Sequence, residues 1–89
     1  MDQQIKERPV IKMTDVVSSQ IAAIGHDPDT NTLAIKFPAT SRQPDGSLYH
    51  YRNFTADDFA AFEAAESKGS HFKKFIRNET EKFPYERVQ

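Results

Sequence analysis

Hydrophobic and polar residues alternate along two stretches near the middle of the chain. Residues 32–37, TLAIKF, place apolar side chains at every second position, and residues 47–54, SLYHYRNF, repeat the alternation with Tyr49 and Tyr51 on one face. Because successive side chains of a strand point to opposite faces of a sheet, both stretches are predicted to be half-buried strands. A further strand is predicted at residues 17–26, which contain β-branched residues and end in the turn sequence DPD.

Two short helices are predicted after these strands. Thr55 and Asp58 have the spacing of a capping box, which predicts that the first helix begins directly after Thr55. Gly69 is expected to end this helix and Ser70 to cap a second one, which must stop before Pro84. Strands followed by helices indicate an α+β fold, a small three-stranded antiparallel meander followed by two helices packed on one face.

The length of 89 residues leaves room for one domain. Residues 1–15 are interpreted as an N-terminal arm, because Pro9 interrupts any regular structure there, and residues 81–89 as a C-terminal tail. The domain itself is expected to span residues 16–80. Within it, residues 38–47, PATSRQPDGS, contain two prolines and an Asp-Gly pair, so they are predicted to form an exposed loop.

Composition narrows the functional classes. The absence of cysteine excludes disulfides and thiolate metal sites, and a small chain without disulfides is expected to be cytoplasmic. No stretch is apolar and long enough for a signal peptide or a membrane span. The formal net charge of −1 argues against bulk electrostatic coating of nucleic acid, but the distribution is uneven. Residues 57–66 hold four acids and no base, whereas residues 68–77 hold four bases and no acid.

The basic stretch contains the first candidate site. If Ser70 opens a helix, its free N–H groups and the nearby Lys68 would suit a phosphate. On a helix, Ser70, Lys73 and Arg77 share one face, and the planar guanidinium of Arg77 would be the strongest phosphate contact. The alternative is a plain junction at which one helix stops and another starts.

Tyr49 and Tyr51 form the second candidate site. Two aromatic rings on one strand face beside basic residues can stack on the bases of single-stranded RNA, but the same rings can simply fill the core. If they are buried, the opposite face of the sheet presents His50 and Arg52, with Lys36 as a neighbour, which would form a secondary cationic patch or ordinary solvated charges.

No catalytic or metal-binding signature is present. The three histidines, at positions 26, 50 and 71, lack the spacing of a metal site, and no motif pairs a nucleophile with a base. The sequence therefore predicts a non-enzymatic protein with no metal and no cofactor.

Four segments, SSQIAAIGHD, TLAIKF, YHY and ESKGSHFKKFIR, occur here in the order typical of the KTSC domain, and the chain resembles that family over residues 16–78. The family is named for its occurrence at the C-terminal end of some lysyl-tRNA synthetases and also includes single-domain bacterial proteins. Residues 38–47 replace a shorter turn of the family pattern, and Phe54 and Thr55 replace its Val-Pro. The motif residues carried by the resemblance are Tyr49, Tyr51, Ser67, Gly69, Ser70, Phe72, Ile76 and Arg77.

Two functional hypotheses follow from the residues and the resemblance. The first is a binding module for RNA or tRNA, in which Lys68, Ser70, Lys73 and Arg77 contact phosphate and the secondary patch assists. The second is a protein–protein interaction adaptor of bacterial or phage origin, in which the loop at residues 38–47 contacts the partner.

Overall fold

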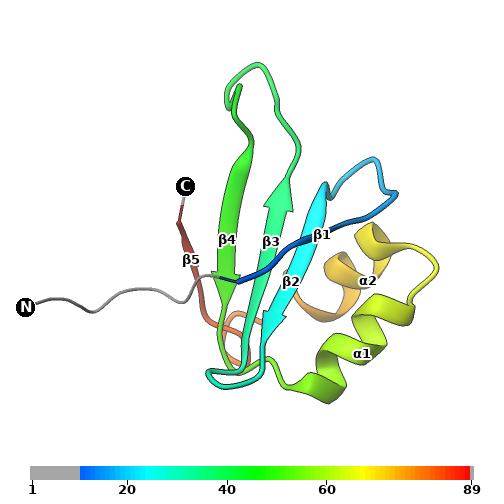
Figure 1. The fold of residues 1–89 in the computed structure, drawn as a ribbon, viewed down its shortest axis with the longest axis vertical. Coiled ribbons are helices and arrows are strands. Elements are labelled where there is room, and N and C mark those ends of the chain that lie inside the picture. The colour runs from blue at the N-terminus through cyan, green and yellow to red at the C-terminus, as the bar shows by residue number, and fades with distance from the viewer. Residues whose placement is uncertain (1–10, 89) are drawn as a thin grey trace, which may run out of the picture.

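The computed structural model describes residues 11–88, which form one antiparallel sheet and two helices (Figure 1). The strands lie in the sheet in chain order. Their bounds are β1 Thr14–Asp15, β2 Ala23–Asp27, β3 Thr32–Phe37, β4 Ser47–Tyr51 and β5 Tyr85–Arg87, and those of the helices are α1 Ala56–Ala64 and α2 Lys68–Phe75. The α+β class is confirmed, and the sheet has five strands where the sequence predicts three.

The two additional strands are the outermost ones. β1 is two residues long and β5 is three, too short for an alternating pattern to stand out in the sequence. β5 lies within residues 81–89, which were predicted to be a tail. β1 lies within the predicted arm at residues 1–15, of which residues 1–10 lie outside the described residues.

The core lies between the sheet and the two helices. Leu33 pairs with Tyr51 and Ile35 with Tyr49, so all four side chains point to the same face of the sheet, and both helices cover that face (Figure 1). The buried hydrophobic cluster consists of Ile21, Ile24, Leu33, Ile35, Tyr51, Phe54, Phe62, Phe72, Ile76 and Phe83.

Helix α1 begins where the capping box predicted. The Thr55 hydroxyl oxygen accepts a hydrogen bond from the Asp58 N–H at 3.1 Å, and the Thr55 N–H donates to the Asp58 carboxylate at 3.1 Å. Two of the N–H groups at the start of the helix are thereby satisfied by local side chains. The prediction of a helix beginning at Ala56 is confirmed.

The predicted junction between the helices is wrong at both of its residues. Ser67, not Ser70, caps α2, and its hydroxyl oxygen accepts from the Ser70 N–H at 3.2 Å. Gly69 does not end α1 but lies buried in the first turn of α2, where a Cβ would be 2.5 Å from Oε1 of Gln20. The missing side chain of Gly69 therefore allows close packing, a role that sequence spacing does not distinguish from helix termination.

The predicted strand at residues 17–26 is only half correct, because β2 begins at Ala23. Upstream of it, the Ser18 hydroxyl oxygen accepts from the Gln20 N–H at 3.1 Å, and Val17 is fully exposed. This local hydrogen bond competes with strand pairing, as serine side chains commonly do. The strand predicted at residues 47–54 is also shorter than expected. β4 ends at Tyr51, shortly before Asn53, whose φ is positive at 61°.

Gly25 provides a test of how the opposite face of the sheet is covered. A Cβ at Gly25 would lie 2.4 Å from the carbonyl oxygen of Lys12 and 2.9 Å from Cγ2 of Ile11. Gly25→Ala is therefore expected to displace the segment at residues 11–13 and to lower the free energy of unfolding by about 1–3 kcal/mol, measured by urea denaturation. Gly69→Ala is the matched control, because its obstacle is the end of the Gln20 side chain, which can rotate away. Equal losses in the two variants would contradict this assignment.

Candidate functional site

A groove of about 630 Å³ lies between α2 and the helix-facing side of the last strands of the sheet. Strands β3, β4 and β5 supply its aromatic floor, and α2 with the residues that follow it supplies one wall. The lining residues are Gln20, Phe37, Ser47, Tyr49, Tyr51, Phe72, Lys73, Arg77, Asn78 and Tyr85. This set contains two cations and no carboxylate.

All three tyrosines of the chain lie in this groove. Tyr51 pairs with Tyr85 across β4 and β5, with ring centroids 5.5 Å apart. Tyr49 lies 5.8 Å from Tyr85 and 6.4 Å from Tyr51. From α2, Phe72 approaches Tyr51 at 5.8 Å and Phe37 at 5.6 Å. These five rings form a continuous aromatic surface that runs from β3 to β5.

The tyrosines lie at different depths. Tyr51 is 5% exposed and belongs to the core, Tyr49 is half-buried, and Tyr85 is 53% exposed. Burial raises the pKa of the Tyr51 hydroxyl above its ordinary value, and the neighbouring Tyr49 and Tyr85 raise it further. Tyr51 is therefore a core residue beneath the groove, whereas Tyr49 and Tyr85 present ring surface to solvent.

Lys73 and Arg77 bring positive charge to the helical wall. Both side chains are exposed, and α2 ends between them at Phe75. The Arg77 N–H donates to the carbonyl oxygen of Phe72 at 2.8 Å, which keeps Arg77 close to the groove after the helix has ended. The Arg77 charge also acts on Tyr51, opposing the rise in its pKa. The cations and the aromatic rings thus line the same groove.

A family model described as the KTSC domain matches residues 17–80, most of the chain. The chain belongs to the KTSC domain family. The crystal structure of a KTSC domain protein from Yersinia pestis is similar, with a TM-score of 0.75 and 29% sequence identity, over 90% of this chain and 100% of that one. No curated protein matches the sequence. The resemblance inferred from the four sequence segments is confirmed.

The KTSC motif residues divide among the groove, the core and the junction between the helices, where Ser67, Gly69 and Ser70 lie. Tyr49, Tyr51, Phe72 and Arg77 line the groove. Ile76 is buried in the hydrophobic cluster beneath α2. The segments through which this chain resembles its family therefore converge on the groove, although they are far apart in sequence.

Two predicted site residues of this KTSC domain, Lys68 and Ser70, lie outside the groove. The ammonium group of Lys68 donates to the carbonyl oxygen of Ala65 at 2.8 Å, which satisfies a group at the end of α1. The Ser70 N–H donates to the hydroxyl oxygen of Ser67 at 3.2 Å, and the Ser67 hydroxyl donates to the hydroxyl oxygen of Ser70 at 3.1 Å. These hydrogen bonds are made within the junction between the two helices. They agree with the alternative interpretation of this segment, a plain junction at which one helix stops and another starts.

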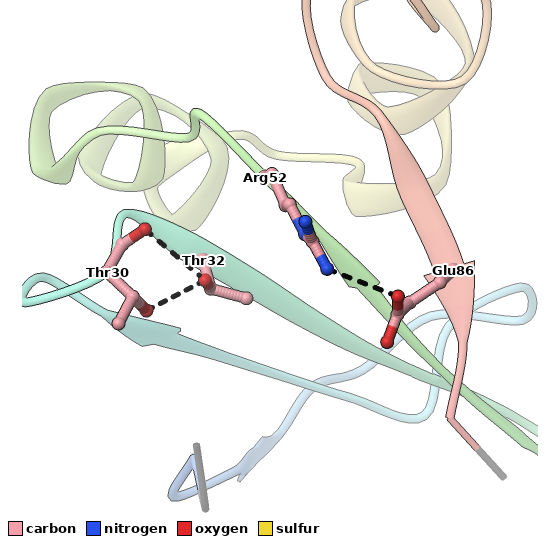
Figure 2. A network of polar contacts seen from close by, with 4 residues as sticks. All are labelled: Thr30, Thr32, Arg52 and Glu86. Carbon is pink, nitrogen blue, oxygen red and sulfur yellow. Dashed lines mark hydrogen bonds and ion pairs between the residues drawn. The ribbon is translucent and has the colours of Figure 1, made fainter. Parts of the chain in front are cut away.

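The three residues of the predicted secondary patch do not line the groove. Lys36 and His50 point to the face of the sheet opposite the groove, and His50 is only 6% exposed. Arg52, just after β4, forms an ion pair with Glu86 of β5 at 3.2 Å (Figure 2). His50 is therefore not part of a solvated charge cluster, and the guanidinium of Arg52 holds the edge strand.

A second cavity, of about 380 Å³, lies on the other side of α2. It contains His71, whose ring stacks on Phe62 at 5.3 Å. Burial lowers the pKa of His71, and the nearby charge of Lys68 lowers it further. Lys74, Lys82, Asp58 and Glu79 also line this cavity, so the charges there are mixed.

Tyr85 is the exposed aromatic residue of the groove that the sequence analysis missed. Its segment, FPYERVQ, has a proline directly before Tyr85 and lies in the predicted tail, yet three of its residues pair with β4. Residues 85–88, YERV, do not alternate apolar and polar side chains, so no local pattern indicates a strand there. Its partner strand ends more than thirty residues earlier, so the pairing depends on tertiary structure.

Residues 11–88 contain no group of three or more His, Cys, Asp or Glu side chains placed to hold a metal ion. Neither helix in that range has the length and apolar character required to cross a membrane.

The burial of Tyr51 leads to a test by alkaline titration. Because the pKa of Tyr51 is raised on folding, its hydroxyl is expected to remain protonated at pH 10, the ordinary midpoint for tyrosine. The Cζ resonance of Tyr51, followed by ¹³C NMR, should therefore not shift at that pH. The unfolded chain loses this proton near pH 10, so the contribution of Tyr51 to stability is complete below pH 10 and declines above it.

Tyr51→Phe is the control for this titration. The variant should show a flatter fall of unfolding free energy above pH 10 than the unsubstituted protein. Half-ionisation of Tyr51 at pH 10 in the folded protein would contradict the burial of its hydroxyl.

Proposed function

We propose that this KTSC domain is a non-enzymatic module that binds RNA, with Lys73 and Arg77 contacting the phosphate backbone. The observation that supports this proposal is the groove lining, which joins two exposed cations to an aromatic floor and, among residues 11–88, contains no carboxylate. In a chain whose net charge is −1, such a local excess of positive charge favours an anionic ligand at this place.

The two cations have complementary properties for this role. Arg77 offers a planar guanidinium that can bind a phosphate through two parallel hydrogen bonds, and Lys73 offers a mobile point charge one turn earlier. Lys68 and Ser70 are left out of the proposed contact, because their polar groups are engaged at the helix junction.

Two phosphate contacts imply weak, salt-sensitive binding. For a single strand, the logarithm of the association constant falls by about 0.7 per neutralised phosphate for each logarithmic unit of salt, so two contacts give a slope of about −1.4. This modest electrostatic contribution is compatible with a nearly neutral protein.

A non-enzymatic role is favoured by the chemistry of the groove. Its lining residues include neither a carboxylate nor an imidazole, the groups most often used for proton transfer. His26 and His71 lie elsewhere, where His26 bonds the carbonyl oxygen of Phe54 at 2.6 Å and His71 packs between phenylalanines.

Protein–protein interaction is the second candidate, and one feature favours it. The loop at residues 38–47 projects beyond the rest of the sheet (Figure 1). It is ordered by its own hydrogen bonds, since the carbonyl oxygen of Gln43 accepts from the N–H groups of Thr40 and Gly46, both at 2.9 Å. An ordered projecting loop is a suitable contact surface for a partner protein.

The RNA proposal is tested by reversing the two charges. Lys73→Glu combined with Arg77→Glu is expected to abolish binding of a fluorescein-labelled single-stranded RNA, followed by anisotropy at low salt. The thermal midpoint should change little, because both side chains are exposed.

Lys74→Glu combined with Lys82→Glu is the matched control for that experiment. It makes the same change in net charge, but both residues line the second cavity, so binding through the groove should be largely retained. Equal losses in the two double variants would contradict a local site. Absence of binding by the unsubstituted protein would favour the protein-interaction role and make the loop at residues 38–47 the next segment to delete.

A further inference from the structure

We infer that the groove holds an unstacked base of a single-stranded segment against Tyr49 and Tyr85, with Lys73 and Arg77 holding the adjacent phosphates. This inference rests on the proposed RNA binding and specifies its ligand. It follows from the geometry of the aromatic floor, the position of the cations and the shape of the groove.

The aromatic floor is exposed where a ligand could reach it. Tyr85 keeps 53% of its surface in contact with solvent, although its ring lies 5.5 to 5.8 Å from the other two tyrosines. The Tyr85 ring packs beside the buried Tyr51, which in turn contacts Phe72 of α2. A partly exposed aromatic surface backed by core residues is the type of platform on which single-stranded nucleic acids stack their bases.

The shape of the groove selects against a duplex. The rings lie on the floor between α2 and the sheet, and only a base turned out of its own stack can lay its face on them. A double helix presents phosphates and base edges but keeps the base faces stacked inside. Phosphate contacts alone would not distinguish single-stranded from double-stranded RNA. Stacking of a base on the aromatic floor would distinguish them, because only the single strand can offer a free base face.

Polar groups at the walls can satisfy the edge of such a base. Gln20, Ser47 and Asn78 line the groove and offer amide and hydroxyl donors and acceptors. Stacking itself tolerates any base, because every base has an aromatic face. The expected selectivity is therefore for single-stranded over double-stranded RNA, with little dependence on sequence.

The second cavity does not share these features. Its charged residues are two lysines together with Asp58 and Glu79, so an anion would meet repulsion as well as attraction there. The exposed Phe75 at that cavity is 57% accessible, close to the value for Tyr85. This similarity makes Phe75 a useful control residue.

The decisive experiment compares a single-stranded RNA with an abasic oligomer of the same length and charge. The chain contains no tryptophan and all three tyrosines line the groove, so tyrosine fluorescence reports on this site alone. The base-containing oligomer should quench the emission, and the abasic oligomer should not. The abasic oligomer should also bind about five-fold more weakly or worse, as expected for the loss of one stacked base.

Substitutions at Tyr85 separate stacking from phosphate binding. Tyr85→Ala should weaken binding of the normal RNA about five-fold or more, measured by anisotropy, and leave the abasic oligomer unaffected. Tyr85→Phe keeps the ring and should bind like the unsubstituted protein, which guards against an effect on folding. Phe75→Ala removes an equally exposed ring outside the groove and should change neither affinity.

The possible failures are distinguishable from one another. Equal affinity for normal and abasic oligomers, with both lost in the Lys73→Glu, Arg77→Glu protein, would overturn base stacking and leave RNA binding in place. Equal affinity for a blunt duplex would overturn the single-strand selectivity. No binding of any oligomer at low salt would overturn both the inference and the proposed function. Equal binding of DNA of the same sequence would support stacking and overturn the assignment to RNA alone.

Discussion

Phe72 joins helix α2 to the sheet, and the positions of the groove residues depend on this contact. Its ring lies edge-on to both Phe37 of β3 and Tyr51 of β4, at 5.6 and 5.8 Å. Since consecutive helical residues are rotated by about 100°, fixing Phe72 toward the sheet places Lys73 about 100° and Lys74 about 200° around the helix from it, so the two lysines lie on different faces. One lysine therefore reaches the aromatic groove and the other reaches the second cavity.

A small domain has little apolar surface to bury, so residues near a site often serve the core as well. Tyr51 illustrates this sharing, because it is buried in the hydrophobic cluster and also forms the deepest part of the groove floor. The two tyrosines of the Tyr-x-Tyr pair differ in burial. Tyr51 is core, whereas Tyr49 and the later Tyr85 provide accessible ring surface.

Local signals in the sequence predicted the elements that depend on local physics. The alternation at residues 32–37 matches β3, and the Thr55 capping box gives the first residue of α1. Two of the errors occurred where a tertiary contact decides. Gly69 resembles a helix terminator until the approach of Gln20 is known, and β5 has too few residues to show a pattern before it pairs with β4. The groove was predictable only in part. Helical spacing alone places Lys73 and Arg77 on one face, but their proximity to the tyrosines depends on the folded sheet.

The shortness of the outer strands has a consequence for self-association. An edge strand can act as a template for a strand from another chain, and the risk grows with its length and flatness. β1 pairs over two residues and β5 over three, whereas the inner strands pair over five. On the β5 side, the Arg52–Glu86 ion pair also places charge beside the edge. The sheet is thereby protected against edge-to-edge aggregation, and its exposed aromatic surface remains on a face, where a ligand can stack without extending the sheet.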